Sequence, residues 1–318
     1  MTRYLLSRCG QALVVIWLTF TLIFFAVQAL PSDPITIFLS RDTAADPETI
    51  ASMREAYGYD RPILEQYVAS LAGLVTGDFG FSLTAGQPVT ERIGAVIGST
   101  IELAGASVLL TVVLALGIAT AATLSTSRRL KNFVLNLPAF FVAIPVFWLG
   151  LLALQLFSIK LGWVSLFPDG SFLALALPVV VLSLHLAAPV AQVLLKALDK
   201  VYEQPYIDVL RAKGASESWI FFRHALKNAA APAMTVAGTT VGAVFAGSVI
   251  TETVFSRSGL GQVLISAVTQ QDIPLLQGIV VLTALVFVLA NLLVDLLYPV
   301  LDPRIVKSGT TSTHALAV

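Results

Sequence analysis

Residues 103–127 read LAGASVLLTVVLALGIATAATLSTS, a run of 25 residues without Asp, Glu, Lys or Arg. A helix rises 1.5 Å per residue, so about 20 apolar residues cross the ~30 Å hydrocarbon core of a bilayer. Backbone polar groups in hydrocarbon are satisfied only within helices or closed barrels. This stretch therefore predicts a membrane-spanning segment.

Five further intervals are also free of charged residues and are 22 to 28 residues long: 9–32, 132–159, 170–195, 228–251 and 273–294. The alternating ten-residue segments that are typical of membrane barrels do not occur. The sequence therefore predicts an all-α membrane protein with six transmembrane helices. Pro138 and Pro145 interrupt the third interval, and Pro178 and Pro189 the fourth, so kinks are expected there.

The overall composition supports a membrane protein and excludes several other classes. Of the 318 residues, 57% are hydrophobic and 12% are charged, whereas about a quarter are charged in soluble domains. The 19 basic and 19 acidic residues give a net charge of zero, so no global field attracts nucleic acid. A single cysteine, Cys9, excludes an internal disulfide, and three scattered histidines give no metal-ligand spacing.

The first interval has one feature of a secretory signal, because Arg3 and Arg8 precede its apolar part. That part runs from Ala12 to Leu30 and exceeds the 7–15 residues of a signal's hydrophobic region. No clean small-x-small cleavage site precedes Pro31. We therefore interpret residues 9–32 as a retained transmembrane helix.

The distribution of Lys and Arg predicts the orientation, since basic residues near span ends tend to remain cytoplasmic. With both termini inside, the inner segments hold 13 of the 19 basic residues and the outer segments hold 6. Segment 33–99 is then extracytoplasmic, residues 100–305 form the remaining membrane core, and 306–318 form a cytoplasmic tail.

The outer segment 33–99 is polar and carries helix-start signals at Asp46-Pro47 and Arg61-Pro62. It predicts short, mostly surface helices, with the turn cluster Gly77-Asp78-Phe79-Gly80 separating two of them. The segment is interpreted either as a cap over helix ends or as a docking surface on the outer side.

The inner segment 196–232 reads KALDKVYEQPYIDVLRAKGASESWIFFRHALKNAAAP. Pro205 starts a helix, Gly214 ends it, and Ser216 is a candidate N-cap for a second helix. Trp219, Phe222 and Leu226 recur at helical spacing in the second piece. This pattern predicts an amphipathic helix, which either contacts a partner at the cytoplasmic face or lies on the bilayer.

Several motifs together resemble the permeases of dipeptide, oligopeptide and nickel-type ABC importers. Arg211-Ala212-Lys213-Gly214 and the following Arg223-His224-Ala225-Leu226-Lys227-Asn228-Ala229 are similar to their EAA loop. Other matches follow in the same order as in that family: Leu30-Pro31-Ser32-Asp33-Pro34, Asp60-Arg61-Pro62, Gly77-Asp78-Phe79-Gly80, Glu252-Thr253-Val254-Phe255, Gly259-Leu260-Gly261 and Leu301-Asp302-Pro303-Arg304. The resemblance covers nearly all of residues 1–305.

The resemblance implies the type I ABC importer permease fold and a subunit without catalytic residues, located in the plasma (inner) membrane of a prokaryote. The implied partners are a second homologous permease, two cytoplasmic ATPase subunits and an extracytoplasmic substrate-binding protein. ATP and Mg would bind to the ATPases, and the chain itself has no G-x-x-x-x-G-K-[ST] phosphate loop. The coupling residues implied by the loop are Asp208, Arg211, Lys213, Gly214, Ser216, Glu217, Trp219, Phe222, Arg223 and His224.

The chain departs from the family pattern where the general motif has Glu-Ala-Ala. Asp208-Val209-Leu210 stands there, so the acid is shorter and the small residues are larger.

His185 and Glu252 are the candidate residues of the translocation path. Ionisable groups inside hydrocarbon are costly and often functional. His185 lies well inside the fourth interval, and the alternative is a neutral imidazole satisfied by a helix carbonyl or hydroxyl. Glu252 lies just beyond the fifth interval, and the alternative is a boundary residue in contact with water or headgroups, or a helix-end partner.

Two other function classes have weaker support. An ion-coupled carrier normally has carboxylates or broken-helix ion sites at mid-membrane, whereas the acids here lie at interval ends. A membrane hydrolase would require a motif such as G-x-S-x-G or H-E-x-x-H, and neither occurs. Peptide is the broadest expectation for the substrate, and nickel chelates, haem, glutathione and opines fit the same subgroup.

The topology can be tested with single cysteines at Ser52 and Ser216 in a Cys9→Ser background. Because Ser52 belongs to the outer segment and Ser216 to the inner one, an impermeant maleimide should label only Ser52→Cys from outside. Both should react after the membrane is permeabilised. Labelling of both from outside would contradict the orientation.

Overall fold

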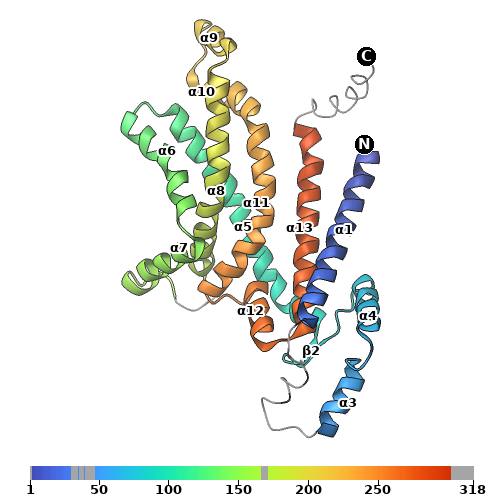
Figure 1. Cartoon of the computed structure of the whole chain (residues 1–318). Helices are drawn as coiled ribbons and strands as arrows, with labels where there is room; N and C mark the ends of the chain where they lie inside the picture. Colours follow the sequence, from blue (N-terminus) through green and yellow to red (C-terminus); the bar gives the residue numbers. More distant parts are fainter. Residues whose placement is uncertain (1, 30–34, 36–38, 40–46, 166–170, 302–318) are drawn as a thin grey trace, which may run out of the picture. The chain divides into compact units, whose positions relative to one another are not determined.

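The computed structural model describes residues 2–29, 35, 39, 47–165 and 171–301 (Figure 1). The expected tail 306–318 and the motif at 30–34 lie outside the described residues. The chain divides into two compact units, residues 1–101 with 257–289 and residues 102–256 with 290–318.

Five helices are long and apolar enough to cross a membrane. They are α1 (Thr2–Gln28), α5 (Val89–Leu124), α8 (Phe172–Tyr202), the continuous helical stretch Glu217–Val254 that ends in α11 (Leu226–Val254), and α13 (Ile273–Leu301). A bent pair of helices raises the number to six if the pair counts as one span. The predicted helical membrane fold is thus confirmed within the described residues.

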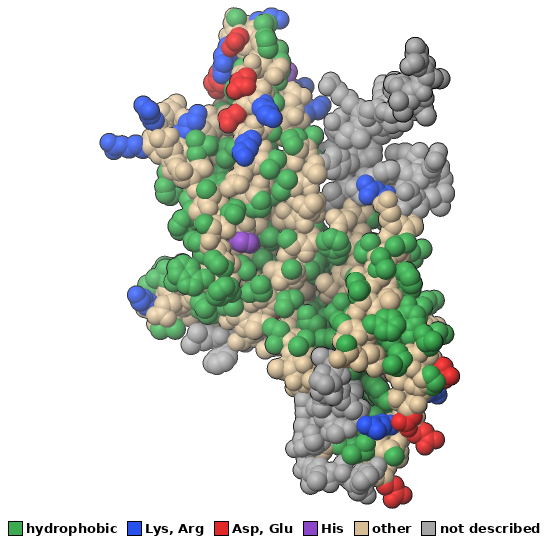
Figure 2. Space-filling view, in the orientation of Figure 1, with side chains coloured by type: hydrophobic (Ala, Val, Ile, Leu, Met, Phe, Trp, Pro, Cys, Tyr) green, Lys and Arg blue, Asp and Glu red, His purple; other side chains and the backbone are tan. Residues whose placement is uncertain are grey.

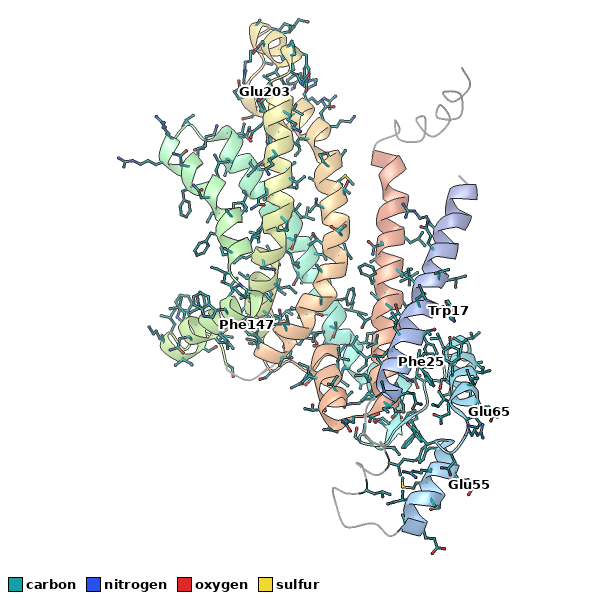
Figure 3. The ribbon with its side chains drawn as sticks, viewed as in Figure 1. Trp17, Phe25, Glu55, Glu65, Phe147 and Glu203 are labelled. Atoms are coloured by element: carbon teal, nitrogen blue, oxygen red, sulfur yellow. The ribbon has the colours of Figure 1, made fainter. Side chains whose placement is uncertain are left out.

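The third predicted span is not one straight helix. It consists of α6 (Arg128–Ala143) and α7 (Val146–Ala153), which continues as the π-helix η1 (Leu154–Lys160), and the two halves meet at 105°. Ile144, the residue before Pro145, has φ −94° and ψ 122°, because a following proline disfavours the helical conformation. Figure 3 shows Phe147 just beyond this elbow. In contrast, Pro178 and Pro189 are accommodated inside the unbroken α8.

The core of the second unit lies between α5, α8 and α11. Leu103 of α5, Leu182 of α8 and Val244 of α11 are almost fully buried together. A second cluster joins Ala115 of α5 to Val190 and Ala191 of α8. Helices α8 and α11 approach closely, since a Cβ built on Gly247 would lie 2.6 Å from Cδ1 of Leu182. Small residues on α11 thus allow the two spans to pack side by side.

Within the described residues, the first unit contains α1, the start of α5, the first part of α13 and five shorter elements. These are α3 (Pro47–Tyr57), α4 (Ile63–Thr76), the antiparallel strands β1 (Phe81–Ser82) and β2 (Gln87–Pro88), and α12 (Leu260–Gln270). The predicted helix starts at Pro47 and after Pro62 are confirmed. The turn cluster Gly77–Gly80 separates two helices as predicted, but the second is not a short surface helix: the two short strands come first, and the long α5 begins at Val89.

Asp272 connects the β-ribbon to the start of α13 in the first unit. Its side chain is 3% exposed, and Oδ2 accepts hydrogen bonds from Ser82 Oγ at 2.5 Å, from Thr84 N at 3.3 Å and from the Thr84 hydroxyl. Oδ1 accepts from the backbone N–H of Leu275 at 3.2 Å and so caps α13. A buried carboxylate with four donors is well compensated.

Replacing Asp272 by Ala should destabilise the protein by roughly 3 kcal/mol or more, because hydrogen bonds to charged groups contribute about 1.5–3 kcal/mol each. The thermal midpoint of the purified protein in detergent measures the effect. Asp60→Ala, at an exposed acid of the same unit, is the control and should change little. An unchanged midpoint for Asp272→Ala would show that this network does not stabilise the unit.

Candidate functional site

The inner segment forms a helical cap at one end of the second unit (Figure 1). Helix α9 (Pro205–Ala212) begins with proline at its first position, where no backbone donor is needed. Asp208 lies in its first turn and Arg211 in its last turn, so both charges favour the helix dipole. Figure 3 shows Glu203 at the base of this cap, just after α8 ends.

Gly214 ends this helix in the left-handed conformation, with φ +82°. Its N–H donates to the carbonyl of Arg211, and the N–H of Ala215 donates to that of Leu210 at 3.1 Å. Ser216 then caps α10 (Glu217–Ile220), since its Oγ accepts from the N–H of Trp219 at 3.3 Å. The predicted helix–glycine–helix arrangement is confirmed.

The second helix differs from the sequence prediction in its register. Helix α10 continues through the π-helix η2 (Phe221–Ala225) directly into α11, so no separate amphipathic helix exists. Trp219, Phe222 and Leu226 were expected to share one apolar face, but they do not. Leu226 packs against the core, whereas Trp219 and Phe222 are 47% and 60% exposed. A π-turn bonds i to i+5 and shifts the register that a regular 3.6-residue period assumes.

The buried face of this segment anchors it to the bundle. Ile220 is fully buried, and Phe221, Ala225 and Ala229 form a cluster with Leu194 and Leu198 of α8 and Ala119 of α5. Ile207 of α9 is also fully buried. The cap is therefore fixed to the spans that it joins.

Arg211 joins the two helical pieces electrostatically. Its Nε and Nη2 donate to Glu217 at 2.7 and 3.4 Å, and its Nη1 donates to Asp208 at 3.3 Å. The hydrogen bond to Glu217 raises the pKa of Arg211, so the guanidinium remains charged. The guanidinium also lies 5.8 Å from the centre of the Tyr202 ring. Exposed pairs contribute little stability, so this paired geometry mainly orients α9 relative to α10.

Most of the predicted coupling residues lie together on the outside of this cap. Trp219 and Phe222 are exposed among charged groups, and Figure 2 shows blue and red side chains gathered at this end of the unit. The exposed members are Asp208, Arg211, Lys213, Gly214, Ser216, Glu217, Trp219, Phe222 and Arg223. This surface presents exposed apolar side chains among charged ones. Its described residues include no contact between a nucleophile and a base.

His224 is the exception among the predicted residues. It is half-buried, its ring centre lies 4.7 Å from that of Trp219, and its Nε2 is buried without a hydrogen-bond partner among the described residues. It therefore packs against the ring of Trp219.

Two further exposed residues of the cap, Val209 and Tyr206, were not among the coupling residues predicted from the sequence. Val209 is 52% exposed beside the charged residues, and Tyr206 is 37% exposed. The Tyr206 hydroxyl accepts a hydrogen bond from Nδ2 of Asn228 at 3.2 Å, which connects α9 to α11. The sequence signal that could have identified them is the presence of three apolar or aromatic residues, Tyr206, Ile207 and Val209, on one short helix, where not all of them can face the core.

The two candidate translocation-path residues lie in the second unit. His185 is half-buried, with Nδ1 3.3 Å from the carbonyl oxygen of Phe141 in α6. This contact agrees with an imidazole satisfied by a helix carbonyl. Glu252 is fully buried, so contact with water or headgroups at a span boundary does not describe it.

The matches to known protein families cover almost the whole chain. Residues 112–307 match the family described as binding-protein-dependent transport system inner membrane component, and residues 1–103 match the N-terminal region of such components. The glutathione transport system permease protein GsiC of Salmonella paratyphi A is 32% identical over 305 residues, which cover 96% of this chain and 99% of that protein. GsiC of Escherichia coli K12 is 30% identical with the same coverage.

The architecture is also similar to a solved permease. A chain from the MetNI methionine ABC transporter in inward-facing conformations aligns with a TM-score of 0.56 at 17% identity, covering 66% of this chain and 96% of that chain. At this identity the likeness concerns the fold. The chain therefore belongs to the family of binding-protein-dependent transport system inner membrane components, the non-catalytic, multi-pass permease subunits of bacterial ABC importers.

Proposed function

We propose that this chain forms half of the translocation pathway of an importer and couples it to ATP hydrolysis through the cap of α9 and α10. In this proposal a second homologous permease completes the pathway and two ATPase subunits bind the cap. A binding protein delivers the substrate from the outer side, and both termini are cytoplasmic. His185 and Glu252 remain candidate residues of the pathway.

The observation that carries this proposal is the construction of the cap. Trp219 and Phe222 expose large apolar surfaces beside the charged groups of the cap, and Val209 adds a third. The buried cluster around Phe221 joins the same segment to α8 and α5. A partner bound to the exposed side chains would thus transmit its own movement to α8 and α5. Coupling of ATPase closure to rotation of the spans requires such a connection.

The proposed substrate class is a small peptide or a solute of similar size. The relatives at 30–32% identity are named for glutathione transport, and glutathione is a tripeptide. The choice between peptides rests with the binding protein and the partner permease, so a ligand that co-purifies with the cognate binding protein would identify it. Uptake that required an ion gradient but no ATP would instead favour a secondary carrier.

Gly214→Val should impair coupling. A branched residue at φ +82° costs about 1–2 kcal/mol, although no atom lies within 4 Å of the added Cβ. Relieving this strain would move α9 away from α10 and disturb the apolar surface. ATP-driven uptake should fall at least about fivefold, the factor that corresponds to ~1 kcal/mol.

Gly162→Val is the matched control, because Gly162 also has positive φ, at +64°, and also has no neighbour within 4 Å of a built Cβ. It lies at the end of η1, outside the cap, and should retain uptake. Co-purification with the partner permease separates a coupling defect from misfolding. Wild-type uptake with Gly214→Val would contradict the proposed role of the cap.

Deleting α3 tests the proposed docking of the binding protein on the outer side. None of residues 48–57 is buried, so replacing Pro47–Tyr57 with a glycine–serine linker should leave the complex assembled. The loaded binding protein should then no longer stimulate ATP hydrolysis, while the basal rate remains. Normal stimulation after the deletion would show that α3 only covers the helix ends on the outer side and does not dock the binding protein.

A further inference from the structure

Helix α4 carries an unusually apolar surface for a segment expected to lie in water. Residues 66–77 read QYVASLAGLVTG and contain no charged residue. Leu64, Val68 and Val75 share one face and are 71%, 62% and 85% exposed. On the adjoining face, Tyr67, Leu71 and Leu74 pack against Phe20 and Phe24 of α1. The helix thus has one apolar face against protein and a second that no described residue covers.

The contacts of Tyr67 fix the level of α4 along α1. Its hydroxyl shares a hydrogen bond of 2.8 Å with that of Thr21, and its ring centre lies 5.3 Å from that of Phe24 and 5.8 Å from those of Phe20 and Phe25. Thr21 lies seven residues before Gln28, the last residue of α1, which corresponds to about 10 Å along the helix. Tyr67 is therefore well inside the stretch of α1 that spans the membrane.

Gln66 lies at the end of the α1–α4 contact that is nearer to the membrane surface. Its Oε1 accepts a hydrogen bond from Nε2 of Gln28 at 3.0 Å, where the span ends, and Glu65 directly precedes it. Figure 3 shows α4 beside the half of α1 that carries Phe25, with Glu65 at the end farther from Trp17. Helix α4 thus begins near the membrane surface and continues alongside the span.

Helix α1 spans the bilayer of a multi-pass membrane protein, so the part of its apolar face that no partner subunit covers contacts lipid. Leu18, Leu22 and Phe25 of α1 are 45%, 70% and 45% exposed. The exposed face of α4 lies at the same level and has the same composition. The two faces are therefore continuous parts of one apolar surface.

The backbone groups at the end of α4 and the charged residue that follows have partners or a cavity within the protein. Gly77 caps α4 in the left-handed conformation and donates to the carbonyl of Gly73, as does the N–H of Asp78 at 2.8 Å. Asp78, the next charged residue after Glu65, lines a cavity of about 350 Å³ together with Arg61 and Gln277. Irregular backbone at membrane depth is tolerated where it lines such a cavity.

From these contacts we infer that α4 inserts into the leaflet nearest Gln28, the outer leaflet in the proposed orientation. Leu64, Val68 and Val75 contact the acyl chains of phospholipids. The outer segment is then not a purely aqueous domain, since α4 enters the bilayer beside α1 and the chain returns through Asp78–Gly80. The inference requires that α1 spans the membrane and that the second permease leaves this face uncovered, and it does not depend on the role of the cap.

Spin labels on single cysteines test this inference in the full-length Cys9→Ser protein, reconstituted in vesicles of phosphatidylethanolamine and phosphatidylglycerol. Labels at Val68→Cys and Val75→Cys should collide readily with oxygen and rarely with a water-soluble nickel chelate. Leu22→Cys on α1 is the lipid-facing control and Ser52→Cys on α3 is the aqueous control. The ratio of the two collision rates at Val68 and Val75 should match that of Leu22.

Collision with the nickel chelate at the level of Ser52 would place α4 in water and overturn the inference. Low accessibility to both reagents would also overturn it, because it would mean that protein and not lipid covers this face. A second variant, Val68→Trp, excludes an effect of the label itself. Brominated acyl chains should quench its additional fluorescence relative to the parent protein, and an absence of quenching contradicts lipid contact.

Discussion

The lack of water in the hydrocarbon core is the constraint on which this structure depends. Every backbone donor and acceptor there must pair within its own segment, so the chain forms long helices wherever charges are absent for more than about 20 residues. Packing between these helices then relies on small residues and close contact, as where Gly247 of α11 meets Leu182 of α8. Segments outside the spans are free of this constraint and carry the polar and irregular features.

The cap of α9 and α10 is the clearest example of such a segment. A left-handed glycine separates its two pieces, and Arg211 orients them through Glu217. The same segment buries Phe221 against α5 and α8 while it exposes Trp219 and Phe222. This division of neighbouring side chains between core and surface connects the exposed side chains of the cap rigidly to the spans.

Much of this architecture could be predicted from the sequence because single residues decide it locally. Charge-free intervals predicted the spans, prolines predicted the starts of α3 and α4, and Gly214 with Ser216 predicted the turn of the cap. The break at Pro145 was expected only as a kink, since its 105° angle depends on what α7 packs against. The prediction that Trp219, Phe222 and Leu226 share one face was wrong, because no local sequence pattern indicated the π-turn between them.

The Asp272 network and the contact of α4 with α1 join residues far apart in the chain, so no local pattern revealed them.

The central claim is that the exposed side chains of the cap contact an ATPase subunit. A photoreactive benzoylphenylalanine placed at Phe222 in membranes of cells that express the whole importer tests it most directly. The account predicts a cross-link to an ATPase subunit from this position and none from the same residue placed at Phe147, which is also exposed but lies at the elbow of the third span. A label at Phe222 that cross-links only to lipid, or to no subunit, would contradict the account.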